Sequence, residues 1–450
     1  MFIGSVIISV ITIIFLILSV LFKPTIKIKN LELQTFWIVT LIGALLLILF
    51  KMIPLKELFN SLTQSSSVNP LKILILFISI SFLSIVLDEL GFFNYISIKA
   101  INLVKNNQWS LFFIIYFLVA ILTIFTSNDI VILTFTPFIC YFSKKGKINP
   151  IPYLVMEFIN ANTYSMLLSI GNPTNIYLSA SFNISFLTYF IKMLIPTLFA
   201  SLASLLVLII LFRSELNKPI SNIKITEIPL KNKKLVIINL IHLIITTILL
   251  AISNYINLEM WLIALICAAS LLIFVLIHTI KEHDSLIKYT IKRLPFNLIP
   301  FLISMFTIVL CLNYQGVIGK IANLFINLSS NKYDTSLSYL ISSTISCNLI
   351  NNIPMTILFS NIINCANPLY LNNAIYATII GSNIGAYLTP IGALAGIMWM
   401  SILKKQEIKY NFLSFVKYGI IIVPVVMLFA YLGLMIIWKV HHVVHFYLLY

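Results

Sequence analysis

Two acidic residues lie inside long apolar segments of this chain, where a buried charge is costly. Asp129 directly follows the polar pair Ser127 and Asn128, and Glu157 lies in the next apolar stretch. A charged residue at bilayer depth costs about 2.5–3.5 kcal/mol on insertion scales and usually serves a proton or ion pathway. We therefore expect Asp129 to bind and release protons, with Glu157 as the second candidate.

Polar residues interrupt the apolar sequence at four places: 126–129, 171–175, 348–356 and 381–392. Glycine and proline in these stretches break the helical ladder, and unwound backbone is tolerated at membrane depth where it is buried in protein or lines a cavity. The hydroxyl and amide side chains expected to bind a substrate are Ser127, Asn128, Asn172, Thr174, Asn175, Asn348, Asn351, Asn352, Asn383 and Thr389. The residues expected to shape the breaks are Gly171, Pro173, Pro354, Gly385, Pro390 and Gly392.

The composition identifies the class of protein. Of 450 residues, 60% are apolar and 9% are charged, whereas a soluble protein has about 45–50% apolar and about 25% charged residues. The net charge of +16 comes from basic residues in short gaps between apolar runs, as in cytoplasmic loops. We expect an all-α polytopic protein that spans the lipid bilayer of a cell membrane, with no nucleic-acid partner. Asp88 and Glu89, and the charged stripe 281–293, are expected at the cytoplasmic interface.

Apolar runs long enough to cross a bilayer predict the helical elements. They cover residues 1–22, 34–53, 70–88, 186–212, 235–253, 259–280, 297–314 and 411–438. Two other stretches, 109–142 and 335–366, each join two apolar segments at a polar tip, which predicts re-entrant helical hairpins. Runs 150–180 and 370–403 contain glycine and proline, which predicts broken helices. We expect about ten transmembrane helices in addition to the two hairpins.

The elements occur in the same order in two halves of the chain. Gly91 corresponds to Gly316 and Asn128 to Asn352. Because each half has an odd number of crossings, the second copy is expected to be inverted, as in secondary transporters. We predict a first inverted repeat at 1–213, a cytoplasmic linker at 214–234, a second inverted repeat at 235–438 and a C-terminal tail at 439–450.

Several of these motifs resemble those of the arsenical pump membrane protein family, the arsenite permeases. They are Ser127-Asn128-Asp129, the segments 171–175 and 385–395, and Asn351-Asn352 with Pro354. That family belongs to the ion transporter superfamily with citrate, dicarboxylate and sulfate permeases. The resemblance covers nearly the whole chain. It implies that the hairpin tips and unwound segments form the substrate and ion site, and that the hairpin domain moves against a scaffold like an elevator.

The hairpin tips favour the arsenical branch. The dicarboxylate branch typically has Ser-Asn-Thr at both tips, whereas this chain has Ser-Asn-Asp at one tip and Asn-Asn at the other. We expect secondary active transport of a small oxyanion or its neutral acid, with proton-coupled efflux of arsenite or antimonite as the leading hypothesis. Alternatives on the same fold are a sodium-coupled di/tricarboxylate or sulfate transporter and a sodium/proton antiporter.

An intramembrane enzyme is the remote alternative, because a carboxylate dyad needs its two acids about 3 Å apart. Asp129 lies on a hairpin tip, whereas Glu157 lies on the next span. We therefore expect no enzymatic activity, no cofactor and no metal site, with H⁺ as the coupling ion and Na⁺ as the alternative. Cys347, close to the second tip, is interpreted as a packed cysteine rather than an arsenic ligand. The resemblance also leaves room for a homodimer and for an ATPase subunit.

Overall fold

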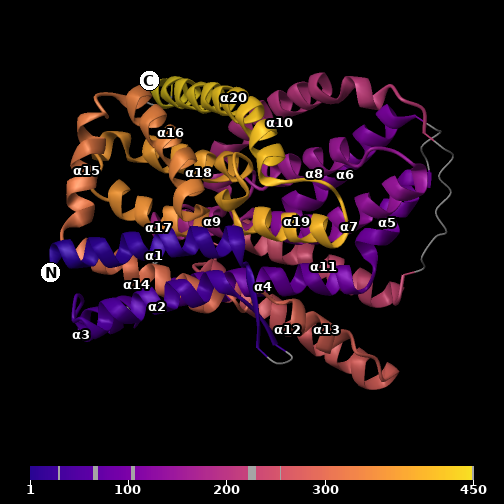
Figure 1. Cartoon of the computed structure of the whole chain (residues 1–450), viewed down its shortest axis with the longest axis horizontal. Coiled ribbons are helices and arrows are strands. Elements are labelled where there is room, and N and C mark those ends of the chain that lie inside the picture. Colours follow the sequence, from indigo (N-terminus) through magenta and orange to yellow (C-terminus); the bar gives the residue numbers. More distant parts are fainter. Residues whose placement is uncertain (29–30, 64–68, 103–106, 221–229, 254, 448–450) are drawn as a thin grey trace.

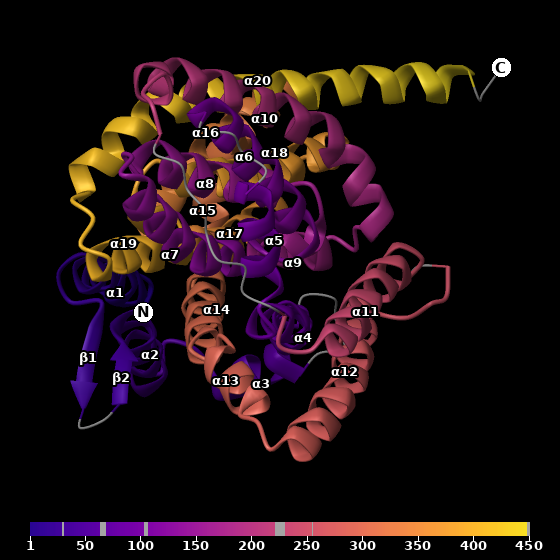
Figure 2. The same ribbon diagram turned by 90° about the vertical axis from the view of Figure 1, so that its right-hand side faces the viewer.

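The computed structural model describes residues 1–28, 31–63, 69–102, 107–220, 230–253 and 255–447. These residues form a helical protein whose helices lie in two groups, one above the other in Figure 2. We call the lower group the scaffold layer and the upper group the core layer. Two short helices, α5 (Phe92–Asn102) and α15 (Val317–Asn327), connect the layers along the chain.

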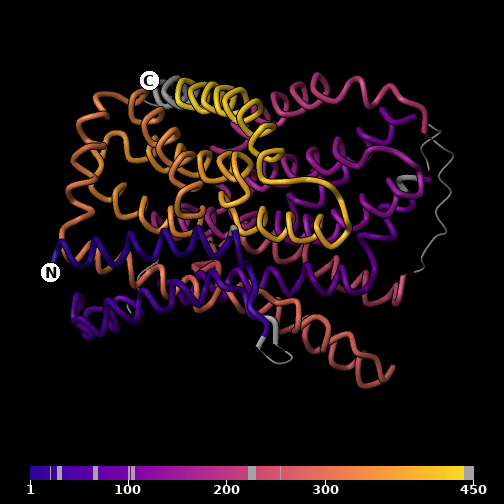
Figure 3. Tube along the Cα trace, in the orientation of Figure 1, coloured from indigo at the N-terminus to yellow at the C-terminus, as the bar shows by residue number. Residues whose placement is uncertain are grey.

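The scaffold layer contains the first elements of each half of the chain (Figures 1 and 2). From the first half come α1 (Phe2–Phe22), β1 (Thr25–Ile28), β2 (Leu31–Gln34), α2 (Thr35–Leu49), α3 (Leu55–Thr63) and α4 (Pro70–Glu89). From the second half come α11 (Lys233–Ala251), α12 (Met260–Glu282), α13 (Leu286–Arg293) and α14 (Leu298–Tyr314). The halves meet where α2 packs beside α14 (Figure 3), with the rings of Phe36 and Phe301 in edge-to-face contact at 5.0 Å.

The core layer contains the hairpins, the broken helices and the last helix of each half. From the first half come α6 (Gln108–Phe125), α7 (Asn128–Gly146), α8 (Ile151–Tyr164), η1 (Ser169–Gly171), α9 (Pro173–Ser181) and α10 (Phe186–Leu216). From the second half come α16 (Lys332–Ile350), α17 (Asn352–Ile363), η2 (Pro368–Tyr370), α18 (Leu371–Ile384), η3 (Gly385–Tyr387), η4 (Pro390–Gly392), α19 (Leu394–Lys405) and α20 (Phe412–Tyr447). All four polar stretches coincide with helix breaks.

The order of elements repeats in detail. In each half a glycine with positive φ lies two residues after the end of the helix that precedes α5 or α15, with φ of +82° at Gly91 and +74° at Gly316. A helix of 11 residues, α5 or α15, follows each of them. These are the positive-φ glycines in the part of the chain that the structure describes. The repeated order agrees with two copies of one unit, and their opposite orientation stays a prediction.

Some bounds differ from the sequence prediction. Residues 25–28 and 31–34 form a two-stranded antiparallel sheet, with Thr25 opposite Gln34, in a chain expected to be all-α. The segment alternates apolar and polar residues, which suits a short hairpin of strands. The last helix continues to Tyr447, into the predicted tail 439–450, and α10 extends to Leu216, into the predicted linker. Residues 221–229 of that linker lie outside the described residues.

Helix length and composition agree with a polytopic membrane protein. Eight described helical segments are long and apolar enough to cross a membrane. One of them is α6, the first arm of a predicted hairpin, which has 18 residues. Others, such as α2 and α17, are apolar but shorter. The all-α polytopic class is thereby confirmed, and the small sheet is the local exception.

Small residues allow the second hairpin to pack closely against the second broken helix. A Cβ atom at Gly381 would overlap the side chain of Ser343, and one at Gly385 would overlap that of Cys347. Glycines four residues apart let two helix backbones approach, as in membrane-helix interfaces. The contact fixes α18 and η3 on α16, so the second tip and the second unwound segment form one unit.

Candidate functional site

A cavity of about 920 Å³ lies between the two layers, within the size range of small-molecule sites. Its wall comes from β1, α4, α7, α14 and α19, together with neighbouring segments. The acidic residues that line it are Asp88, Glu89 and Asp129, and the basic ones are Lys231, Lys292, Arg293 and Lys405. Ser127 also lines it, so the cavity reaches the tip of the first hairpin.

The first tip is built by two helix caps. Thr126 ends α6, and its hydroxyl donates to the carbonyl oxygen of Leu122 at 2.7 Å. Ser127 has an extended backbone and is the N-cap of α7, where its Oγ accepts the N–H of Ile130 at 3.4 Å. Hydroxyl residues are favoured at this position because they bond an orphan N–H group of the first turn. Asn128 donates from Nδ2 to Oδ1 of Asn162 at 3.0 Å, which fixes the tip on α8.

Asp129 and Asn128 have unused polar groups at this tip. Asp129 lies in the first turn of α7, on the cavity wall, where the helix dipole stabilises its negative charge. It makes no hydrogen bond or ion pair with any other described residue. The Oδ1 atom of Asn128 is buried and has no partner among the described residues. The tip therefore offers a carboxylate to the cavity, and the amide oxygen beside it is buried without a partner among the described residues.

Glu157 is in a different environment. It is fully buried between α7, α8 and α19 and does not line the cavity. Thr136 Oγ1 lies 3.0 and 3.1 Å from the two carboxyl oxygens, and Trp399 Nε1 donates to Oε2 at 3.3 Å. No cation accompanies this carboxyl group among the described residues. Its partners among the described residues are thus two neutral groups, one on α7 and one on α19.

The two unwound segments are bonded to each other through asparagine side chains. Asn172 Nδ2 donates to Oδ1 of Asn383 at 2.9 Å, and Asn383 Nδ2 donates to Oδ1 of Asn175 at 2.7 Å. Ser165 Oγ donates to the same Asn383 oxygen at 3.0 Å. All of these side chains are buried. Asn383 therefore joins α18 to the η1–α9 segment, and we call this set of contacts the amide bridge.

Thr174 lies at the edge of the amide bridge. Ser382 Oγ donates to Thr174 Oγ1 at 3.3 Å, and Thr174 Oγ1 lies 3.4 Å from Oδ1 of Asn175. The bridge continues towards the first tip, because Ser165 Oγ is also 2.8 Å from the carbonyl oxygen of Asn162. Asn162 and Ser165 thus lie between Asn128 and Asn383, as expected if the breaks meet.

The second tip is bonded to the second unwound segment. Asn351 has a φ of +72°, and its Nδ2 donates to the carbonyl oxygen of Ile391 at 2.9 Å. Asn348 Oδ1 accepts from the N–H and the hydroxyl of Thr389 at 3.0 and 2.7 Å, and its Nδ2 donates to the carbonyl oxygen of Gly385 at 2.9 Å. Asn352 begins α17 and is buried, and its side chain has no hydrogen-bond partner among the described residues.

The prolines and glycines expected to shape the breaks act in two ways. The prolines occupy first turns of helices, and the glycines allow two backbone segments to pack closely. Pro173 and Pro390 are the first residues of α9 and η4, and Pro354 is the third residue of α17. Proline suits these positions because the first turn has no internal partner for its missing N–H. Gly171 does not have a positive φ, so a left-handed backbone is not the reason for glycine at this position.

Close packing explains the glycines instead. A Cβ atom on Gly171 would lie 2.9 Å from Cα of Ser165, and one on Gly392 would lie 2.7 Å from the carbonyl oxygen of Gly385. Either contact is closer than a real Cβ atom tolerates. Any side chain at these positions would therefore push two backbone segments of the site apart.

The structure thus brings the four breaks together in the core layer but opens only one of them to the cavity. Among the predicted site residues, Ser127 and Asp129 line it. The amides of the other breaks bond to protein groups, apart from Asn352. Cys347 is buried, and its Sγ donates to the carbonyl oxygen of Thr344 at 3.2 Å, in agreement with a packed cysteine.

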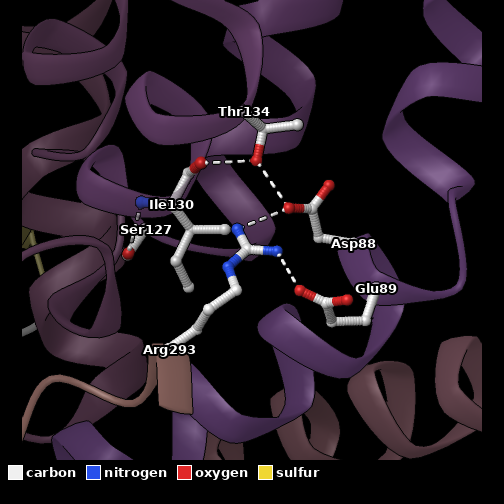
Figure 4. A network of polar contacts seen from close by, with 6 residues as sticks. All are labelled: Asp88, Glu89, Ser127, Ile130, Thr134 and Arg293. Atoms are coloured by element: carbon white, nitrogen blue, oxygen red, sulfur yellow. Dashed lines mark hydrogen bonds and ion pairs between the residues drawn. The ribbon is translucent and has the colours of Figure 1, made fainter. Parts of the chain in front are cut away.

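Sequence reasoning missed a charged network on the cavity wall (Figure 4). Arg293 donates from Nη2 to Asp88 Oδ2 at 2.6 Å and from Nη1 to Glu89 Oε1 at 2.7 Å. Thr134 Oγ1 lies 2.9 Å from the same Asp88 oxygen. The available signal was an acidic pair and an arginine expected at the same membrane face, but nothing in the sequence paired them.

Known proteins resemble this chain along most of its length. Residues 31–375 match the family model of the citrate transporters. A putative arsenical pump membrane protein of Bacillus subtilis (strain 168) is 24% identical over 372 residues, which cover 77% of this chain and 83% of that protein. The arsenical pump membrane protein of Escherichia coli (strain K12) is 22% identical over 356 residues, with coverage of 77% and 81%.

A solved structure shares the fold. The YdaH transporter of Alcanivorax borkumensis superposes with a TM-score of 0.54 at 12% identity, covering 96% of this chain and 97% of that one. The predicted resemblance to the arsenical pump proteins and the wider superfamily is confirmed by these matches. The chain belongs to the citrate transporter family and is a multi-pass transporter of the plasma membrane.

Proposed function

We propose that this chain is a secondary active transporter that exports arsenite or antimonite, as the neutral acid, in exchange for protons. One observation carries the proposal: the similarity to arsenical pump membrane proteins extends over 77% of the chain. The geometry of the first tip supports it, because the cavity reaches a carboxylate with no basic partner.

The first tip suits a neutral hydroxyl-bearing acid. Such a molecule needs hydrogen-bond donors and acceptors rather than a cation, and Ser127, Asn128 and Asp129 supply them within one helical turn. A hydroxyl group of the substrate can donate to the ionised carboxylate of Asp129. A proton can bind to the same oxygen atoms. Because the two occupy one group, binding of one displaces the other, which is the requirement for exchange.

The cost of burying a charge makes this exchange obligatory. An ionised carboxylate carried through the bilayer centre without a partner is penalised by about 2.5–3.5 kcal/mol on insertion scales. The hairpin therefore moves more readily with Asp129 protonated or bonded to substrate than with a bare carboxylate. Each 1.4 kcal/mol corresponds to a factor of about ten in population, so the bare form would move about a hundredfold less often.

Transport in liposomes tests the proposal. We expect liposomes with an acidic lumen to accumulate arsenite, a protonophore to abolish the accumulation, and a sodium gradient alone to drive none. Asp129→Asn retains hydrogen bonding but cannot exchange a proton, so it should bind arsenite without proton-driven accumulation. Absence of arsenite flux under any gradient, or proton-driven flux unchanged by Asp129→Asn, would contradict the proposal.

A sodium-coupled di/tricarboxylate or sulfate transporter is the second candidate. Four basic residues line the cavity, Lys231, Lys292, Arg293 and Lys405, and the matching family model is that of citrate transporters. Basic residues at a cavity raise the local concentration of an anion. Uptake of citrate, succinate or sulfate that requires sodium and ignores a proton gradient would select this candidate. Sodium flux without any anion would instead indicate a sodium/proton antiporter.

A further inference from the structure

A hydrogen bond between two side chains joins the scaffold layer to the core layer. Thr134 Oγ1 on α7 lies 2.9 Å from Asp88 Oδ2 on α4. In the described part of the chain, and leaving Asn69 and Asn102 aside, the other hydrogen bonds and ion pairs stay within one layer or involve the connecting segments. This contact is therefore a specific polar tie between the two layers.

The remaining boundary between the layers is formed by helix packing. α4 packs against α7 and α9, and α14 packs against α17. Most of the buried side chains on α4 and α14 are apolar. Apolar contacts are non-directional, so they permit several relative positions of similar free energy. A directional hydrogen bond can then decide which position is populated.

The acceptor of this bond is fixed within the scaffold. Asp88 Oδ2 also accepts from Arg293 at 2.6 Å, and Arg293 is held in turn by Glu89 at 2.7 Å (Figure 4). The guanidinium group balances the charge of Asp88 whether or not Thr134 is present. The carboxylate is therefore held in one orientation and is not left as an unpaired charge when the core layer moves.

The donor also has a second partner. Thr134 Oγ1 lies 2.9 Å from the carbonyl oxygen of Ile130 on its own helix. The hydroxyl has one proton, which can go to Asp88 or to Ile130. When α7 moves away, the proton turns to Ile130 and neither group loses all of its partners. Release therefore avoids the penalty of an unsatisfied buried group, as a contact broken in every cycle requires.

We propose that the contact between Thr134 and Asp88 is a releasable tie that holds the α6–α7 hairpin where the cavity reaches Ser127 and Asp129. Thr134 is then a positioning residue for transport. Its hydrogen bond favours the conformation in which this cavity is open. Arg293, held by Glu89, orients the Asp88 carboxylate that accepts this bond. The inference rests on the proposed function only in that the core layer moves against the scaffold during transport.

Two cysteine reporters measure the effect of removing the tie. Ser401 lies on α19 and lines the cavity, whereas Ser179 lies on α9, beside a second cavity, and is fully buried. Ser401→Cys and Ser179→Cys are introduced separately on a background with Cys365→Ser, because Cys365 is the exposed cysteine among those described. A thiol reagent is applied to the purified protein without substrate.

Thr134→Val removes the hydroxyl at nearly constant volume. We expect the ratio of the labelling rates, Ser401→Cys over Ser179→Cys, to fall about fivefold, which corresponds to about 1 kcal/mol at 1.4 kcal/mol per tenfold change. Thr134→Ser keeps the donor and should restore the ratio. If Thr134→Val folds poorly, Thr134→Ala must shift the ratio in the same direction.

Thr378→Val is the matched control. Thr378 is buried in the core layer on α18, and its hydroxyl donates to Ala374 on the same helix at 2.8 Å. This variant should leave the labelling ratio unchanged. An unchanged ratio in Thr134→Val, or an equal shift in Thr378→Val, would overturn the inference. The measurement needs no transported substrate, so a failure of arsenite transport would refute the proposed function and leave this result standing.

Discussion

Replacing Asn383 by alanine should destabilise the core layer far more than the loss of one asparagine normally does. Asn383 is the centre of the amide bridge, with bonds to Asn172, Asn175 and Ser165 from another segment of the chain. The substitution removes all three bonds together. The η1–α9 segment would then be attached to α18 by packing alone, apart from the weak contact of Thr174 with Ser382 at 3.3 Å.

The expected loss follows from which groups keep a partner. Hydrogen bonds between membrane helices contribute about 0.6 kcal/mol each on average, so three bonds account for about 2 kcal/mol. Ser165 keeps the carbonyl oxygen of Asn162, and Asn175 Oδ1 keeps Thr174. Asn172 Nδ2 loses the one partner it has among the described residues, and a buried orphan donor costs about 1–3 kcal/mol. Since the orphan term includes one of the lost bonds, we expect a total of about 2–4 kcal/mol.

Asn373→Ala provides the control on the same helix. Asn373 is buried on α18 and donates to Ser336 Oγ at 3.1 Å, and Ser336 keeps a second bond to Lys332 at 2.8 Å. This variant deletes the same volume but one bond, so it should cost about 0.6 kcal/mol for the bond. The difference between the two variants isolates the bridge from the effect of the cavity.

Unfolding in mixed detergent micelles can be followed by the reactivity of buried thiols. Cys140, Cys267, Cys311 and Cys347 are buried and become reactive when the helices separate. We expect the free energy of unfolding of Asn383→Ala to lie about 1.5–3 kcal/mol below that of Asn373→Ala, by the difference of the two estimates. Equal losses in the two variants would show that the bridge does not hold the breaks together, and the reasoning would fail.

The remaining predictions concern the ionisable groups. Asp129→Asn should reduce proton-driven arsenite flux at least tenfold. Arsenite binding, measured by calorimetry, should be retained. Glu157→Gln should stay folded and remain proton-coupled, because the amide can still accept the bond from Trp399; loss of coupling in this variant would transfer the role to Glu157. The hydrogen bond from Lys72 holds the pKa of Glu259 below its ordinary value of 4.5. The pair therefore stabilises the fold above about pH 4.5, and this contribution is lost as the pH falls through the lowered pKa. In thermal melts, Lys72→Met should lack this loss of stability at acidic pH. In the unsubstituted protein the loss should be smaller at high salt.

The order and type of the elements could be predicted because they depend on local sequence. Apolar runs of bilayer length specify helices, and clustered glycine, proline and asparagine stop them at the four breaks. The alignment of Gly91 with Gly316 was informative for the same reason, since both positions have the positive φ that glycine adopts without strain. The short strands at 25–28 and 31–34 were missed because eight paired residues give too weak a periodic signal beside long apolar runs.

The partners within the site could not be predicted in the same way. The sequence indicates that Asn175 and Asn383 both lie in breaks, but which amide bonds to which depends on the packing of segments that are 208 residues apart. The network of Asp88 and Arg293 joins residues 205 apart. Several polar side chains lie at the same depth in the membrane, and each could pair with more than one of the others. The angles at which the helices cross decide which pairs form, and the sequence pattern does not contain these angles.

The two cavities lie at opposite ends of α4. Asp88 at one end lines the larger cavity, and Lys72 lines a second cavity of about 460 Å³. Sixteen residues of helix separate them, which is about 24 Å at 1.5 Å per residue. This is a large part of the bilayer thickness, so the two cavities face opposite sides of the membrane if α4 crosses it upright.

The amide bridge is not the barrier that must open between these cavities. Its members all belong to the core layer, on η1, α9 and α18 and the segments beside them, so they move together. What separates the cavities is the contact of the core layer with α4 and α14. For the proposed transport, exchange of access would therefore require the core to slide along these helices with its amide bridge intact. On this argument, a cross-link within the core layer, between α10 and α20, should permit transport, whereas a cross-link between α4 and α7 should abolish it.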